Sequence, residues 1–200
     1  MDAAGTARLE AFSDGVFAIA ATLLVLSFSV GSVAGSTLDT ALFHLWPAYL
    51  AYATSFLTIG IIWMNHHHCV LLMERADRTL LFVNLLLLMI VAFLPFPTKL
   101  VADYLRADGE QAAVLAYTGT FLAMAIVYNL WWRYASAGRR LIGESVPDRE
   151  VQAVTRAFNP GIPMYAVTFL VALASPVASV ILTFLVAAFY LPSAALFSRE

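Results

Sequence analysis

The chain has 200 residues, of which 62% are hydrophobic and 12% are charged, and its mean hydropathy is +0.82. Soluble domains usually carry about 45–50% apolar and about 25% charged residues. The composition therefore predicts an integral membrane protein and excludes a water-soluble domain. The net charge of −2 offers nothing to nucleic acid, and a single cysteine, Cys69, excludes an intramolecular disulfide framework.

Apolar stretches set the expected spans. A helix needs about 20 mostly apolar residues to cross the roughly 30 Å hydrocarbon core. The last apolar block, 161–197, is about twice that length, and it is interrupted at Ser175-Pro176, where proline breaks the helical hydrogen-bond ladder. We therefore predict an all-α polytopic membrane protein, a single domain over 1–200 with six transmembrane helices. Their expected ranges are 12–30, 46–66, 79–101, 112–134, 161–174 and 176–197.

The basic residues predict the orientation, because cytoplasmic loops are enriched in Lys and Arg near the membrane. With the N-terminus inside, nine basic residues fall on the cytoplasmic side and only Lys99 and Arg106 fall outside. Both termini are therefore expected in the cytoplasm. Ser32-Val33-Ala34 has the small residues of a signal-peptide cleavage site, but the acidic segment before it has the wrong charge. The cytoplasmic set is Arg8, Arg75, Arg78, Arg133, Arg139, Arg140, Arg149, Arg156 and Arg199.

One face of the first helix alternates aliphatic and small hydroxyl residues. Positions three and four apart share a helix face, which aligns Gly15, Ile19, Thr22, Leu26 and Ser29, with Leu23 beside them. The hydroxyls could bond carbonyls of their own helix while the helix packs in its bundle. Alternatively the stripe could line a pore in which apolar rings gate by dewetting. Spacing alone favours packing, because helical apolar stripes are common.

Polar residues are fused to the front of this helix. We expect Asp14 in the first turn, where the helix dipole and free N–H groups favour a carboxylate. Asp14 lies about 140° round the helix from Ile19, so it should face other helices of the same subunit. A carboxylate there needs a partner, and Arg8 or a donor from another helix could supply it. The simpler alternative is an ordinary N-cap beside an interfacial arginine.

The second helix ends in a cluster of possible donors and ligands. Trp63 and His66 share a face, and a buried indole N–H needs an acceptor, which Ser13 or Asp14 could provide. The three consecutive histidines diverge by about 100° per residue and cannot converge on one ion. Cys69 could join His66, but two ligands are too few for a zinc site. We predict no metal site, and a proton-sensing role for the histidines stays open.

Two further segments complete the chain. Pro95 and Pro97 should end or kink the third helix. Tyr128, Trp131 and Trp132, followed by Arg133, suggest an interfacial aromatic belt at the end of the fourth helix.

No catalytic constellation and no TVGYG-type filter loop is visible in the sequence, so we expect neither an enzyme nor a conventional potassium-channel architecture.

The block RLEAFSDGVFAIAATLLVL, residues 8–26, resembles the transmembrane protein 175 family of potassium channels. Trp63 with His66-His67, and Pro95-Phe96-Pro97-Thr98, support the resemblance. It implies a prokaryotic single-repeat member in the inner (plasma) membrane, assembled as a homotetramer whose four first helices line a central pore. It also implies constricting rings and a hydroxyl layer in the pore, and a signature block that holds the pore helix. The rings would be Ile19, Leu23 and Leu26, the layer Thr22, and the block Arg8, Phe12, Ser13 and Asp14 against Trp63 and His66.

The implied function is a potassium-permeable channel with modest selectivity over sodium, because aliphatic rings and a few hydroxyls replace lost water less well than carbonyl filters do. Its expected partners are other copies of itself, membrane lipid and permeant potassium ions, with no cofactor. The alternative is a proton-permeable protein or an ion-coupled secondary transporter that uses the histidines of the second helix.

Overall fold

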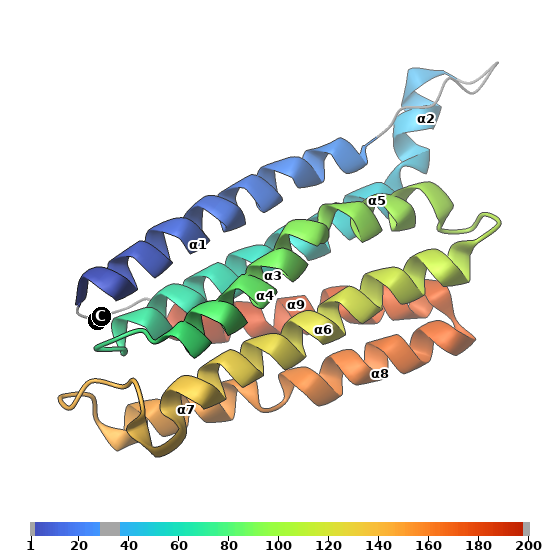
Figure 1. Cartoon of the computed structure of the whole chain (residues 1–200). Coiled ribbons are helices and arrows are strands. Elements are labelled where there is room, and N and C mark those ends of the chain that lie inside the picture. Colours follow the sequence, from blue (N-terminus) through green and yellow to red (C-terminus); the bar gives the residue numbers. More distant parts are fainter. Residues whose placement is uncertain (1–2, 29–36, 198–200) are drawn as a thin grey trace.

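The structure, a computed structural model, describes residues 3–28 and 37–197 (Figure 1). Ser29, Ser32-Val33-Ala34 and Arg199 lie outside the described residues. Over the described ranges every named secondary-structure element is a helix, which confirms the all-α prediction. The helices are α1 (Ala3–Leu23), continued by the 3-10 helix η1 (Leu24–Ser27), α2 (Leu38–His44), α3 (Trp46–Leu71), α4 (Arg78–Phe93), α5 (Pro95–Tyr104), α6 (Glu110–Ser136), the 3-10 helix η2 (Ala137–Arg139), α7 (Asp148–Phe158), α8 (Gly161–Ala174) and α9 (Pro176–Phe197).

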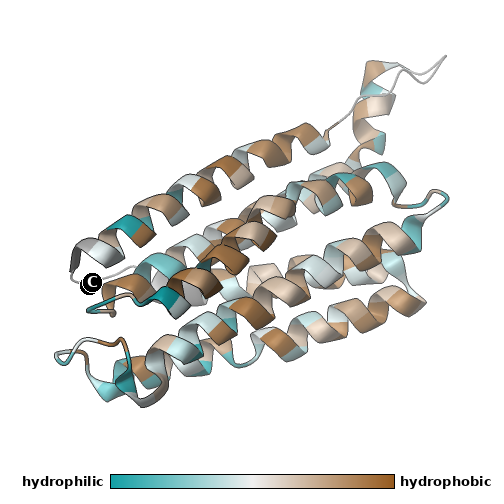
Figure 2. Cartoon of the chain, viewed as in Figure 1, coloured by the Kyte–Doolittle hydropathy of each residue, from teal (hydrophilic) through white to brown (hydrophobic). Residues whose placement is uncertain are grey.

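Among the described residues, five stretches are long and apolar enough to cross a membrane, one fewer than the six expected. The difference lies in the last helix, where the apolar stretch Pro176–Pro192 is shorter than the others. Figure 2 shows the hydrophobic residues along the helices and the hydrophilic ones concentrated near their ends. The five stretches are Gly5–Ser27, Trp46–Leu71, Arg78–Tyr104, Glu110–Arg139 and Asp148–Ala174.

Prolines mark the breaks between helices. α4 ends at Phe93 and α5 begins at Pro95, and α9 begins at Pro176 directly after Ser175. Proline lacks the N–H that would continue a helical ladder, but it is tolerated in a first turn. α8 alone has 14 residues and is only about 21 Å long. The candidate span that contains it therefore begins in α7 and continues through the Asn159-Pro160 junction.

The helices pack as a bundle with α1 along one edge (Figure 1). α1 contacts α3 and α4, whereas α6 lies centrally and contacts α4, α5, α8 and α9. The expected interfacial belt is wrong: Trp131 and Trp132 are fully buried and Tyr128 is nearly so. Because α6 is surrounded by four helices, its aromatic end packs inside the subunit instead of facing lipid headgroups.

The two ends of the bundle differ in the loops they carry. The start of α1, the α3–α4 connection and the α6–α7 connection lie at one end, and α2 and the α5–α6 connection lie at the other (Figure 1). The connections at the first end contain the basic residues Arg75, Arg139 and Arg140. In the α5–α6 connection at the other end, Arg106 is the single basic residue. The unequal distribution of basic residues expected from the sequence thus corresponds to the two ends of the folded bundle.

Asp77 joins two helices at the arginine-rich end. Its Oδ1 accepts the backbone N–H of Leu80 at 2.8 Å, which caps α4, and its Oδ2 accepts the Tyr134 hydroxyl at 2.7 Å. Burial opposes ionisation of this carboxyl, but the N–H of Leu80, the Tyr134 hydroxyl and the charge of Arg140 outweigh that effect. The pKa of Asp77 therefore lies below its ordinary value.

Replacing Asp77 by Ala should destabilise the fold by about 1–2 kcal/mol through loss of the cap. Because the folded pKa is depressed, the stabilisation is present above the ordinary carboxyl pKa and is lost as pH falls through the folded pKa. Thermal unfolding in detergent should show a lower midpoint for Asp77→Ala at neutral pH and a smaller difference in acid. Asp108→Ala, at an exposed loop position, is the control; equal losses in both variants would contradict the cap assignment.

Candidate functional site

α1 presents two chemically different faces. Leu9, Ser13, Phe17, Ala20 and Leu24 are buried against the bundle. The predicted stripe lies on the other face, where Ile19 is 61% exposed, Leu23 41% and Leu26 65%, and Thr22 is also exposed. The subunit therefore leaves uncovered the residues that the sequence placed on the possible pore face.

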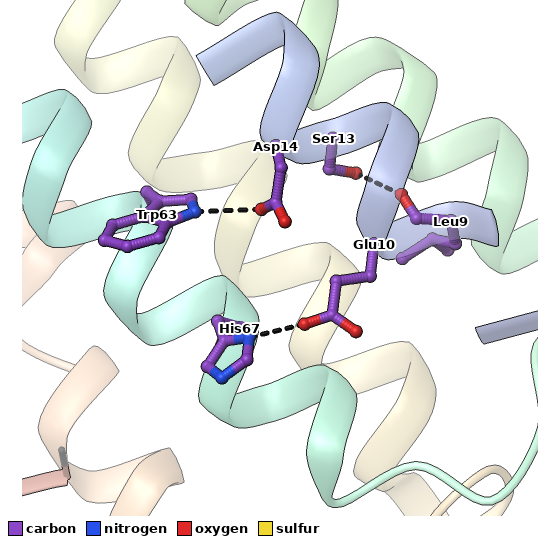
Figure 3. A network of polar contacts seen from close by, with 6 residues as sticks. All are labelled: Leu9, Glu10, Ser13, Asp14, Trp63 and His67. Atoms are coloured by element: carbon purple, nitrogen blue, oxygen red, sulfur yellow. Dashed lines mark hydrogen bonds and ion pairs between the residues drawn. The ribbon is translucent and has the colours of Figure 1, made fainter. Parts of the chain in front are cut away.

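Asp14 is tied to α3. Its Oδ1 accepts the indole N–H of Trp63 at 2.8 Å (Figure 3), one of the pairings raised from the sequence. The expected first-turn position is wrong, because α1 begins at Ala3 and Asp14 lies well inside the helix. The N–H groups around it are already bonded within the helix, so the carboxylate is available to another helix instead of acting as a cap.

A separate, buried chain of hydrogen bonds begins at the preceding residue, Ser13. Ser13, fully buried, donates its hydroxyl to the Leu9 carbonyl at 2.8 Å and accepts Asn84 Nδ2 of α4 at 3.0 Å. Asn84 Oδ1 lies 2.9 Å from His66 Nε2 of α3. Since Nδ2 is the donor to Ser13, Oδ1 is the acceptor, and His66 donates from Nε2. The chain thus joins α1, α4 and α3.

Aromatic rings fix His66 on both sides. Its ring stacks on Trp131 with centroids 4.7 Å apart and meets the Phe17 ring edge-on at 5.5 Å. A buried imidazole held in this way has little freedom to turn, so its hydrogen bond to Asn84 has a fixed direction. We refer to Ser13, Asp14, Trp63, His66 and Asn84 together as the polar anchor.

The other members of the expected signature block lie elsewhere. Arg8 and Phe12 are exposed on α1, so the polar contacts of the block with Trp63 and with the His66 chain are made by Asp14 and Ser13. No role for Asn84 was predicted from the sequence. Its signal was available: it is a polar side chain in an otherwise apolar helix, and such residues face the bundle interior.

The three histidines point to three helices. Besides the contact of His66 with α4, His67 pairs with Glu10 of α1 (Figure 3), and His68 Nε2 lies 3.8 Å from Glu150 of α7. Glu10 is a second residue that the sequence did not single out. Within the part of the chain that the structure describes, no three His, Cys, Asp or Glu side chains gather as ligands for a metal ion.

The exposed face changes its helical geometry near its end. The Thr22 hydroxyl donates to the Ile19 carbonyl at 2.8 Å, so its proton is used within the helix while oxygen lone pairs remain available. From Leu24 to Ser27 the chain is a 3-10 helix, which is tighter than an α-helix. Leu26 therefore continues the exposed face, but the rotation per residue around it is that of a 3-10 helix, whereas Ile19 and Leu23 follow the α-helical rotation.

The chain is similar to known potassium channels. The family model described as "Endosomal/lysosomal potassium channel TMEM175" matches residues 8–95. A potassium channel of Chamaesiphon minutus is 43% identical over 188 residues, which cover 92% of this chain and 93% of that one. A potassium channel of Streptomyces collinus is 48% identical over 134 residues, covering 66% of this chain and 65% of that one.

A solved structure extends the similarity to the fold. The crystal structure of a lysosomal potassium-selective channel TMEM175 homolog from Chamaesiphon minutus superposes with a TM-score of 0.85 at 42% identity, covering 98% of both chains. The similarity of the fold therefore extends beyond the helices α1 to α4, where the family model matches, to nearly every helix of the bundle.

Asn84→Leu tests the buried part of the polar anchor. The change keeps the approximate size of the side chain but leaves His66 Nε2–H without its acceptor and Ser13 without a donor. An unsatisfied buried group costs about 1–3 kcal/mol, so the thermal midpoint in detergent should fall. Thr118→Val is the matched control, because the buried Thr118 hydroxyl bonds only the Val114 carbonyl of its own helix. If both substitutions lower the midpoint equally, the chain through Asn84 has no special role.

Proposed function

The chain belongs to the TMEM175 family, and on that premise we propose that it forms a potassium-permeable channel whose pore is lined by α1. The family is one of ion channels, not of enzymes. One observation carries the proposal: α1 is held along one face by the polar anchor and leaves its aliphatic face uncovered. A subunit that presents this face to an axis could form a pore with three other copies.

The proposed assembly is a homotetramer in the inner (plasma) membrane of a prokaryote, with both termini in the cytoplasm and six crossings per subunit. α9 supports the sixth crossing, because it packs along α3 and α8 and extends from Pro176 to Phe197. The arginine-rich connections support the orientation, since basic loops stay on the cytoplasmic side.

The proposed constriction consists of rings of Ile19, Leu23 and Leu26. An ion that passes such rings must shed water, and aliphatic groups return no ligands for it. Potassium is more weakly hydrated than sodium, so this barrier favours potassium. A layer of Thr22 hydroxyls partly replaces the lost water. Each hydroxyl donates its proton to the Ile19 carbonyl, and its oxygen lone pairs remain available to the ion. The resulting selectivity is weaker than that of a filter lined by carbonyl oxygens.

Ile19→Asn should raise potassium flux on the order of tenfold, which corresponds to lowering the barrier by about 1.4 kcal/mol. The amide would wet the constriction and offer ligands to a dehydrated ion. Flux is measured in liposomes with a potassium gradient, with sodium as the comparison ion. Leu85→Asn, on an exposed face of α4, is the control for adding an amide to a membrane helix; equal effects of the two variants would refute the constriction.

The same experiment separates the alternative functions. Currents that follow the electrochemical gradient indicate a channel, whereas saturable flux of fixed stoichiometry indicates a transporter. The polar contacts of His66, His67 and His68 are with three different helices, which argues against one proton route shared by all three. Proton flux that persists without potassium flux would favour the proton-permeable alternative over the proposed one.

Thr22→Val should lower the preference for potassium over sodium about fivefold, because a hydroxyl contact contributes on the order of 1 kcal/mol. Thr22→Ser keeps the hydroxyl and should keep most of the preference. The reversal potential under bi-ionic conditions gives the ratio for each variant. Equal ratios for Thr22→Val and the wild type would remove Thr22 from the proposed selectivity layer.

A further inference from the structure

A small cavity, partly open to the surface, lies between helices of the subunit and away from the proposed pore. Its lining comes from α3, α6, α8 and α9 and from the end of α7, and none of it from α1. The volume is about 60 Å³. Aliphatic and aromatic side chains make up most of the wall, and the polar side chains on it are Thr58, Asn65, Tyr128, Asn129, Tyr165 and Tyr190.

Asn65 is the feature that needs explanation. The residue is 7% exposed, and its side-chain amide makes no hydrogen bond with any part of the chain that the structure describes. The other buried asparagines differ: Asn84 bonds Ser13 and His66, and Asn129 donates to the carbonyls of Ala125 and Phe158. Buried polar groups are nearly always hydrogen-bonded. The Asn65 amide lacks a partner in the described chain and borders the open space of a mostly apolar pocket, which indicates a polar ligand there.

We propose that water molecules occupy this cavity and hydrogen-bond Asn65. A site needs about 10–15 Å³ of this kind of volume for each water, so on the order of four waters fit. An apolar ligand does not suit the site, because it would leave the amide unpaired. A potassium ion does not suit it either, because the mostly apolar wall offers too few oxygen ligands to replace the ion's hydration shell.

The position of Asn65 gives these waters a role. Asn65 lies between Trp63 and His66 on α3, and it is about 200° round the helix from Trp63. Trp63 therefore faces α1 while Asn65 faces α6 and α9. The waters form a polar link on the side of α3 opposite the contact with Asp14, so that α3 is held on both sides. The cavity shares no residue with α1, so its occupation by water does not depend on whether α1 lines a pore.

Hydroxyl-radical footprinting of the wild-type protein in nanodiscs tests the proposal directly, because bound water is the source of the radicals. Met124 and Tyr128 line the cavity although they are only 1% and 6% exposed. Both should be labelled several-fold faster than Trp132 and Tyr117, which are 1% and 0% exposed and do not line the cavity. Equal, slow labelling of all four would overturn the proposal, whether the cavity is dry or filled by an organic molecule.

Asn65→Leu supplies a second test with a sign that distinguishes the alternatives. If waters bond the amide, the substitution removes their anchor, slows labelling of Met124 to the rate of Trp132 and lowers the thermal midpoint. A dry cavity predicts the reverse, a higher midpoint, because an unpaired amide is removed.

Ala125→Leu, which fills the cavity and keeps Asn65, should also slow labelling of Met124. Unchanged labelling in a folded Ala125→Leu protein would overturn the proposal, and potassium flux measured in parallel reports separately on the pore.

Discussion

The rotation of α1 about its own axis depends on hydrogen bonds that are made inside the subunit. Lipid tails are as apolar as leucine, so burial of apolar surface gives little preference for one helix face over another in a membrane. Ser13 and Asp14 supply that preference, because each has a partner on a neighbouring helix, Asn84 and Trp63. With those two contacts made, the direction of every other α1 side chain follows from the helical step of 100° per residue.

That dependence explains why polar residues are tolerated at the start of an apolar helix. A serine and a carboxylate facing lipid would be costly, yet facing α3 and α4 they are satisfied and select a single rotation. Ile19 of α1 and Leu26 of η1 then stay more than half exposed in the described part of the subunit, although both are strongly apolar. A face of this kind in a membrane protein is covered either by lipid or by other copies of the chain, and the proposed channel requires the second.

Sequence patterns predicted the parts of this arrangement that depend on one helix at a time. The alignment of Ile19 and Thr22 on one helix face follows from spacing, although spacing alone favoured packing of that face inside the bundle and only the family resemblance implied that it is uncovered. A donor for Asp14 follows from its angle to that stripe. Contacts that need the packing of several helices were not predictable. Asn84 had no expected partner, and Trp131 was assigned to the membrane interface because the sequence does not show that four helices surround α6. The start of α1 was placed late because hydropathy detects the apolar part of a helix and not its polar first turns.

The run of three histidines shows how the same geometry excludes one function and permits another. Successive helical side chains diverge by about 100°, so neighbouring imidazoles cannot bind one metal ion. The same divergence lets a single turn of α3 contact three helices, with His66 bonded to Asn84 of α4, His67 to Glu10 of α1 and His68 near Glu150 of α7. An imidazole can both donate and accept, and it does not have to be charged to do so, which suits it to the membrane boundary. The α3 terminus thereby sets the spacing of the three helices at the end of the bundle where α1 begins, and any movement of α1 that widens a pore has to be accommodated there.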